Sequence, residues 1–142
     1  MDVLLGGQNY GGRQHYLRFK VPNTWYHWAN LGLTYDSSLG YPKYTGFRCG
    51  TCHPFQPFDI ASDTMIDIWE YPLIVMDGTL KIHRQLTPEQ GEQHIMKLAR
   101  RCLDVKGNFV MLWHNSSLHR DWQSWGEMYA HVVPKLAELC RG

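Results

Sequence analysis

The chain has 142 residues, a length that allows one domain of ordinary size, so residues 1–142 are treated as a single domain. Hydrophobic residues make up 44% of it and aromatic residues 13%. A chain of this size and composition buries roughly two-thirds of its unfolded surface, which excludes a disordered protein. Fourteen Lys and Arg against thirteen Asp and Glu give a net charge of +1, and no basic stripe is present. We therefore exclude nucleic acid as a partner.

The longest apolar runs, residues 73–76 and 109–113, are far shorter than the roughly twenty residues needed to cross a bilayer. Residues 1–7 lack the basic and apolar segments of a secretory signal. The sequence therefore predicts a soluble, cytoplasmic chain with no membrane partner. In that setting the four cysteines are expected to be reduced thiols: Cys49, Cys52, Cys102 and Cys140.

The first predicted elements surround a short helix. Paired glycines at 11–12 and the alternating residues after them indicate the end of a strand that enters a loop. A helix is predicted between Pro22, which is typical of a helix start, and Gly32, which is typical of a stop. A brief strand at 33–36 leads into residues 37–57, which have no regular period and are interpreted as a long functional loop.

The next predicted element is a strand region at 65–76, which alternates at first and then becomes uniformly apolar. Pro72 prevents an unbroken central strand, and Asp77-Gly78 is interpreted as the turn that ends the region. Thr87, followed by a proline and by Gln90 three positions later, has the pattern of a capping box and predicts a helix.

The last elements are a strand and a helix. The helix that begins after Thr87 is expected to stop at Gly107, and residues 109–113 are apolar on both faces, as in a buried parallel strand. This strand delivers His114 and Asn115 at its carboxyl end. Large apolar residues at helical spacing from Trp122 onward predict a final helix, which contains Pro134.

The order of these elements indicates an α/β fold, specifically a partial (β/α) barrel-like parallel sheet with flanking helices. A closed barrel of eight such units needs about 200 residues or more, so this chain would lack the N-terminal half of one. The open edge of its sheet would then be covered by a second copy, giving a homo-oligomer, or by a missing N-terminal half.

Polar side chains follow the predicted strands at their carboxyl ends, where parallel α/β proteins place their chemistry. Arg13 and Tyr16 follow the first strand, and Asp36, Asp77 and His114 follow the others. Histidine is the usual general acid near neutral pH, and a carboxylate beside it would hold its tautomer. These residues are our candidate catalytic group.

Five segments together resemble the C-terminal half of polysaccharide deacetylase-like (NodB-like) domains, from about Gly11 to the end of the chain. The segments read GGRQHY, YDSSLGY, GFRCGT, EYPL and LWHN, and begin at residues 11, 35, 46, 70 and 112. In that family a distorted βα barrel binds a divalent metal and removes acetyl groups from sugar chains. The resemblance implies the same fold and substrate class for this chain.

Residue by residue, the resemblance implies that Arg13 orients the catalytic base, an aspartate. It matches Tyr16 to the residue whose backbone N–H binds the oxyanion, and His114 to the histidine acid. The aspartate that supports this histidine maps to Asp36 by the residues that follow it, or to Asp77 by strand order, and both stay open. The candidate substrate-binding residues are Tyr41, Arg48, Trp113 and Asn115.

The family's Asp-Asp motif and its two-histidine metal motif belong to the N-terminal half and are not in this chain. His15 also stands where the arginine motif usually has proline. We therefore expect no metal ligand and no cofactor in this chain alone, with zinc or a similar divalent metal only in a complete domain. The implied protein is a truncated carbohydrate deacetylase that is inactive by itself.

Two other functions remain open. Aromatic residues in and around the long loop would suit a non-catalytic glycan-binding or assembly module, because flat rings stack on sugar faces. Cys49, Cys52 and His53 form the C-x-x-C-H pattern of a c-type haem electron-transfer protein. The same pattern fits a thioredoxin-like dithiol or half of a zinc site. Structural use of both thiols is the expected reading.

Overall fold

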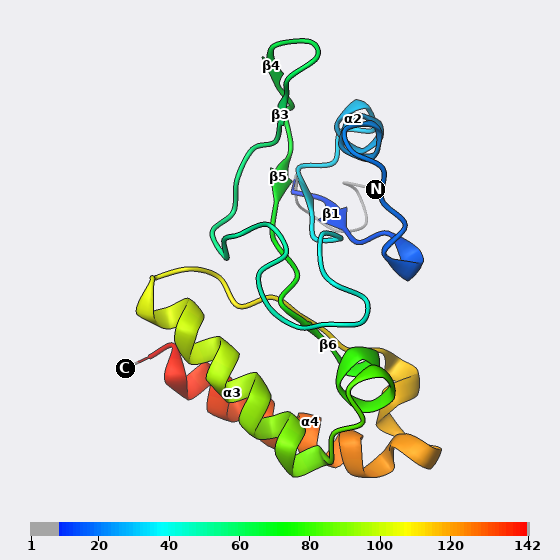
Figure 1. Cartoon of the computed structure of the whole chain (residues 1–142), viewed down its shortest axis with the longest axis vertical. Coiled ribbons are helices and arrows are strands. Elements are labelled where there is room, and N and C mark those ends of the chain that lie inside the picture. Colours follow the sequence, from blue (N-terminus) through cyan, green and yellow to red (C-terminus); the bar gives the residue numbers. More distant parts are fainter. Residues whose placement is uncertain (1–8, 142) are drawn as a thin grey trace.

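The computed structural model describes residues 9–141 and shows a mixed α/β fold with three small sheets (Figure 1). Residues 1–7, in which no secretory signal is predicted, lie outside the described residues. Between residues 9 and 141 the parallel strands do not close into a barrel. Among the helices of that range, none has the length and apolar character required to cross a membrane.

The first sheet contains three parallel strands in the order β1 (Gly11–Gly12), β2 (Tyr35–Asp36) and β5 (Trp69–Glu70). Helix α2 (Asn23–Asn30) lies beside it. The residue Gly32, just after this helix, has a φ of +73°, a left-handed conformation that glycine adopts without strain. The predicted short helix and its glycine stop are therefore confirmed.

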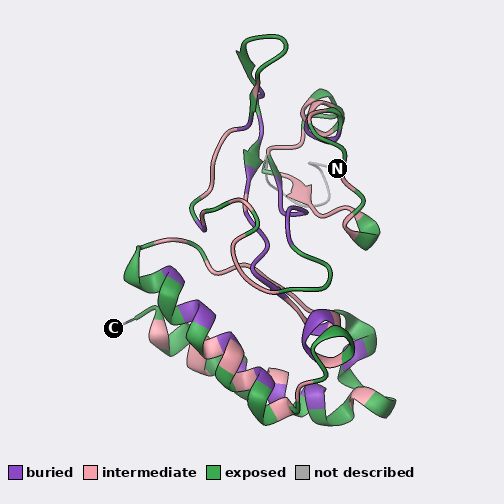
Figure 2. Ribbon diagram, in the orientation of Figure 1, coloured by how far each residue is buried: buried purple, intermediate pink, exposed green. Residues whose placement is uncertain are grey.

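The long connection from β2 to the next strand is irregular, as the sequence predicts. Residues 37–57 contain no helix and no named strand. They lead into the antiparallel hairpin of β3 (Phe58–Asp59) and β4 (Thr64–Met65), whose tip is exposed (Figure 2). Pro72 separates β5 from the strand that follows, so the predicted strand region is divided.

The second parallel pair consists of β6 (Val75–Met76) and β7 (Met111–Leu112). The predicted parallel strand at 109–113 is thus present, although only two of its residues are paired. After β6 the structure differs from the prediction: Asp77-Gly78 does not simply end the strand, because Gly78 caps a π-helix, η2 (Thr79–His83). This extra helical turn keeps the chain next to the end of β6.

Two long helices complete the fold, α3 (Pro88–Asp104) and α4 (Gln123–Leu139), and they lie side by side (Figure 1). The predicted capping box is confirmed, because Thr87 Oγ1 accepts from Gln90 N–H and Gln90 Oε1 accepts from Thr87 N–H. Two short 3₁₀ helices join β7 to α4. They are η3 (Asn115–Leu118) and η4 (Arg120–Trp122), so Trp122 precedes α4.

Buried apolar side chains gather in two cores. The first core, next to α2 and the first sheet, consists of Trp25, Leu39, Ile66 and Ile68. The second core lies between α3, α4 and β6. Its members are Cys52, Ile74, Val75, Leu80, Ile95, Leu98, Cys102, Trp125, Met128 and Val132. Two carboxyl side chains, Asp36 and Glu70, are fully buried in the first sheet.

Candidate functional site

His114 and Asp77 form a hydrogen-bonded pair at the ends of two neighbouring strands. Asp77 directly follows β6 and His114 lies two residues after β7. Because these strands are parallel, their carboxyl ends lie at the same edge of the pair. His114 Nδ1 lies 2.8 Å from Asp77 Oδ1. Asp77 is fully buried, whereas the His114 side chain is 47% exposed, so the imidazole is accessible and its partner is shielded.

The Asp77 carboxylate is held by the backbone as well. Its Oδ2 accepts from His114 N–H at 2.8 Å, and its Oδ1 accepts from Gly78 N–H at 2.7 Å. Backbone N–H groups only donate, so the carboxylate acts as an acceptor and Nδ1 of His114 carries the proton that faces it. This arrangement leaves Nε2 as the ring nitrogen that can exchange a proton with a bound molecule. Of the two candidate aspartates, Asp77 is therefore the one that contacts His114.

Arg13 and His114 line a common cavity of about 480 Å³, together with Tyr16, Pro42 and His83. Arg13 follows β1 and donates from Nε to the carbonyl oxygen of Ser37 at 2.7 Å, which fixes its guanidinium beside the second strand. Three of the predicted site residues, Arg13, Tyr16 and His114, therefore line the cavity. They follow the ends of different strands.

Burial lowers the pKa of Arg13, while the nearby carboxyl groups of Asp36 and Glu70 act in the opposite direction. An arginine side chain keeps its charge through such a shift, since its ordinary pKa is far above neutral. The cavity therefore combines a fixed cation at Arg13 with a histidine whose other side is held by a carboxylate. Such a combination can bind an anionic group and move a proton near it.

The wall of the cavity near Tyr16 has an unusual backbone. The alternating stretch after Gly12 does not continue as a strand end, because His15–Leu17 form the 3₁₀ helix η1. Within it Tyr16 and Leu17 have φ values of 58° and 51°, the left-handed region that costs side-chain-bearing residues about 1 kcal/mol each. The side chain of Tyr16 is exposed, so its backbone rather than its ring is what the fold constrains.

Asp36 belongs to a different cluster. Its two carboxylate oxygens accept from the hydroxyl and the backbone N–H of Ser38, at 2.7 and 2.8 Å. Its neighbour across the β2–β5 register is Glu70, which accepts from Trp25 Nε1 at 2.9 Å. Burial, together with the adjacent Asp36, raises the pKa of Glu70 to about 8. These two carboxyl groups form a buried pair on one face of the sheet. The sequence analysis did not select Glu70.

The four predicted substrate-binding residues do not line the cavity of Arg13 and His114. The Tyr41 ring packs edge-on against Tyr44, and Arg48 donates to the carbonyl oxygen of Gly40 at 2.9 Å. Trp113 stacks on Tyr129 at the second core. Asn115 accepts from the N–H of the next residue. Each of them therefore has a local structural role in this fold.

The structure adds His83, which sequence reasoning did not select. It lies at the end of η2 and lines the same cavity as His114. The π-helix brings it there, because a π-turn inserts a residue and redirects the chain, often at functional sites. Thr79, at the start of that turn, donates to the Pro42 carbonyl oxygen at 2.7 Å and so ties η2 to the cavity wall. No periodic pattern in the sequence signals this turn.

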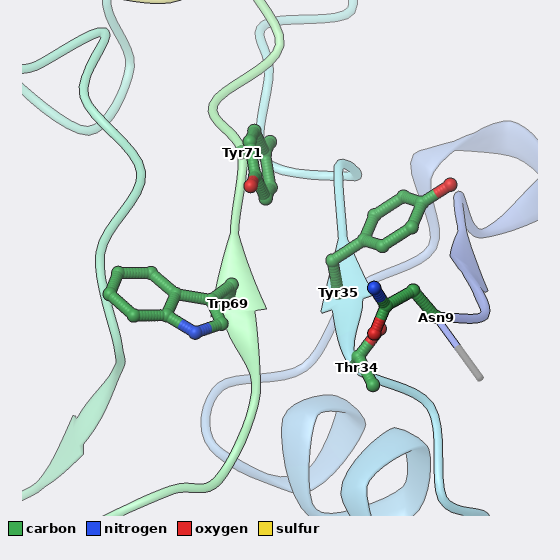
Figure 3. A pocket seen from close by; sticks show the side chains of 5 residues that line it. All are labelled: Asn9, Thr34, Tyr35, Trp69 and Tyr71. Carbon is green, nitrogen blue, oxygen red and sulfur yellow. The ribbon is translucent and has the colours of Figure 1, made fainter.

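A second hollow lies on the other face of the first sheet. Figure 3 shows the side chains of Tyr35, Trp69 and Tyr71 around it, with Asn9 and Thr34 beside them. The hollow measures about 480 Å³, and Tyr35 and Tyr71 meet edge to face at 5.8 Å. Successive strand residues point to opposite faces, so this aromatic face is the reverse of the one that holds Asp36 and Glu70.

Cys49 and Cys52 do not form an exposed motif. Cys52 is 3% exposed and packs in the second core, whereas His53 is exposed. Burial raises the pKa of the Cys49 thiol to about 11, which disfavours the reactive thiolate that a thioredoxin-like dithiol needs. Within residues 9–141, no three His, Cys, Asp or Glu side chains converge as a metal site.

Compared with known proteins, the chain matches no family model, no curated protein and no solved structure.

Proposed function

We propose that this chain is the C-terminal part of a polysaccharide deacetylase-like domain and contributes the acid side of a site that removes acetyl groups from a carbohydrate. The observation that carries the proposal is the His114–Asp77 pair, in which a half-exposed imidazole is hydrogen-bonded at 2.8 Å to a fully buried carboxylate. Its position at the carboxyl ends of two parallel strands is where α/β enzymes place catalytic groups.

In this proposal His114 protonates the leaving amine or alkoxide from Nε2, while Asp77 holds the ring and its tautomer. Arg13 orients a base aspartate carried by the missing N-terminal half, and the backbone N–H of Tyr16 binds the oxyanion. The base and the ligands of a divalent metal such as zinc come from that missing half. The isolated chain is therefore expected to be inactive.

The aromatic face of the first sheet supports an incomplete barrel. In βα barrels the helices cover the outside of the sheet and side chains of the strands fill the inside. Here Trp25 of α2 donates to Glu70 on one face, whereas within residues 9–141 no helix residue lines the hollow of Tyr35, Trp69 and Tyr71 on the other face (Figure 3). The missing half, or a second copy of the chain, would cover this face. Light scattering distinguishes the two, since only the second copy makes the isolated chain a dimer.

The direct test is acetate release from acetylated oligosaccharides in the presence of zinc or cobalt. We expect no release by the isolated chain, and release when a separately produced N-terminal half of a deacetylase-like domain is added. His114→Ala is expected to lower that rate at least about 100-fold, while His131→Ala on the exposed side of α4 leaves it unchanged. Release by the isolated chain that disappears in His114→Ala would contradict the claim of an incomplete site.

A second test needs no partner. Nitrogen NMR of the His114 ring is expected to report a proton on Nδ1 in the wild type. In Asp77→Ala the acceptor that faces Nδ1 is removed, and the ring should populate both tautomers. An unchanged tautomer in Asp77→Ala would show that Asp77 does not position His114, and the acid role would lose its support.

The aromatic hollow of Figure 3 favours a second candidate function, a glycan-binding module without catalysis. Calorimetric titration with oligosaccharides in the presence of a metal chelator tests this function. Binding that is lost in Trp69→Ala, but kept in Phe58→Ala on the exposed hairpin, would favour the module. Absence of binding to any oligosaccharide under these conditions would exclude it.

A further inference from the structure

Cys52 and Cys102 approach each other in the second core from two distant parts of the chain. Cys52 belongs to the long irregular loop, and Cys102 lies in the last turns of α3. The two residues are 3% and 1% exposed, and both belong to the buried cluster of the second core. In the structure both are free thiols.

The backbone around the two thiols holds them in place. Asn108 N–H donates to the Cys52 carbonyl oxygen at 3.0 Å, and Gly107 N–H donates to the Cys102 carbonyl oxygen at 2.8 Å. Two consecutive residues therefore fix both cysteine backbones. A Cβ atom at position 107 would overlap Cys52 Sγ, so glycine there leaves the space that the thiol occupies.

We propose that Cys52 and Cys102 are a disulfide-forming pair that links the long loop to α3. The co-reactant is a low-molecular-weight disulfide, which is reduced to two thiols while the two cysteines are oxidised. One cysteine thiolate attacks the disulfide and releases the first thiol. The other thiolate then displaces the second thiol, and the Sγ–Sγ bond forms. Two protons leave the cysteines and end on the released thiols.

The burial of the pair sets when this reaction occurs. Burial, together with the neighbouring Cys52, raises the pKa of the Cys102 thiol to about 12, so its thiolate is scarce in the folded protein. The bond therefore forms while the chain folds or when the loop opens, and it forms slowly in the intact native state. Once formed, it is shielded from reducing agents by the same burial.

The bond would support the wall of the candidate site. The loop that carries Cys52 also contains Pro42, which lines the cavity of Arg13 and His114. Gly46 N–H of the same loop donates to the Ile74 carbonyl oxygen at 2.8 Å, just before β6. A covalent link at Cys52 restricts opening of the loop and thereby keeps this wall against η2 and β6.

The nearest rival pairing is Cys49 with Cys52, the two cysteines of the C-x-x-C pattern. Cys49 packs against the first core, whereas Cys52 belongs to the second core, so their side chains serve different cores. The remaining thiol, Cys140, is exposed and near the end of the chain. The structure thus favours Cys102 as the partner of Cys52.

The pairing is tested by refolding the reduced full chain with a mixture of reduced and oxidised glutathione, blocking the free thiols with N-ethylmaleimide and mapping peptides by mass spectrometry. We expect one cross-link between Cys52 and Cys102, with Cys49 and Cys140 blocked. Cys49→Ser should keep this cross-link, and Cys102→Ser should lose it. A Cys49–Cys52 cross-link, or a chain with all four thiols blocked, would overturn the proposal.

Denaturant unfolding gives a second readout that does not require any variant to fold well. The oxidised wild type is expected to unfold at a higher urea midpoint than the same protein after reduction, because the link restricts the unfolded chain between residues 52 and 102. Cys49→Ser should show the same shift on reduction. Equal midpoints for the oxidised and reduced wild type would contradict a stabilising link between the loop and α3.

Discussion

The two cores of the protein are built from different kinds of side chain. The second core contains ten buried apolar residues, contributed mainly by two helices of 17 residues each. The first core has four buried apolar residues, and the buried carboxyl groups of Asp36 and Glu70 lie beside it. The first core depends on hydrogen-bonded polar groups, and the second core depends on apolar burial. Their stabilities should therefore respond differently to truncation and to pH.

The largest effect is expected from a cavity in the second core. Ile95 of α3 is fully buried, and Ile95→Ala should lower the free energy of unfolding by about 4 kcal/mol. The matched control is Ile82→Ala in η2, where the side chain is 62% exposed and the loss should stay below about 0.5 kcal/mol. Urea unfolding followed by tryptophan fluorescence measures both. Equal losses would mean that the second core is not packed as described.

The first core should be most sensitive at Glu70. Glu70→Ala leaves Trp25 Nε1 and the Leu39 N–H without their acceptors and should lower the free energy of unfolding by about 3 kcal/mol. Glu70→Gln keeps an oxygen acceptor for one of these two donors, so a smaller loss is expected. A Gln variant as unstable as the Ala variant would mean that the retained amide oxygen stabilises neither donor.

The same residue should make stability depend on pH. The pKa of Glu70 is raised to about 8 in the folded protein, above its ordinary value of 4.5, so the folded state holds a proton that the unfolded state releases earlier. This contribution is complete below about pH 4.5 and is lost as the pH rises through about 8. Between pH 6 and 9 the free energy of unfolding of the wild type should fall by about 2 kcal/mol more than that of Glu70→Gln, as measured by urea unfolding. If the stability of the wild type and of Glu70→Gln depends on pH in the same way, the raised pKa of Glu70 is contradicted.

The smallest effect is expected at the start of α3. Thr87→Ala removes the hydroxyl that accepts from Gln90 N–H and should lower the free energy of unfolding by about 1 kcal/mol. Thr87→Ser retains the acceptor and is the control. Because this helix packs on the second core, hydrogen exchange in its first turn should rise in the Ala variant only. An unchanged exchange rate would mean that tertiary packing, not the cap, holds that turn.

The helices could be predicted from local chemistry. Thr87 and Gln90 define the start of α3, and Gly32 marks the end of α2, because caps and stops depend on neighbours along the chain. The strands were less predictable, since each named strand pairs only two residues and pairing is decided by distant segments. The π-helix after Asp77 was missed, because its turn follows from packing rather than from a periodic pattern.

The candidate site could be predicted from the sequence in part. Arg13 and His114 follow strands whose parallel order was inferred from the sequence, and they line one cavity. The choice between Asp36 and Asp77 depended on which strands are neighbours, and the β6–β7 pairing brings Asp77 to His114. Glu70 carried one usable signal, a carboxylate in register with Ile66 and Ile68 on a buried alternating face.

The hydrogen bonds of Asp77 serve two purposes at once. One carboxylate oxygen orients the His114 ring, and the other holds the backbone N–H of the same residue, which ties the end of β7 to the end of β6. Selection for folding alone would therefore preserve this aspartate, even in descendants that no longer turn over a substrate. Arg13, which follows β1 and donates to the carbonyl oxygen of Ser37 just after β2, links two strand ends in a similar way and would be preserved by the same selection.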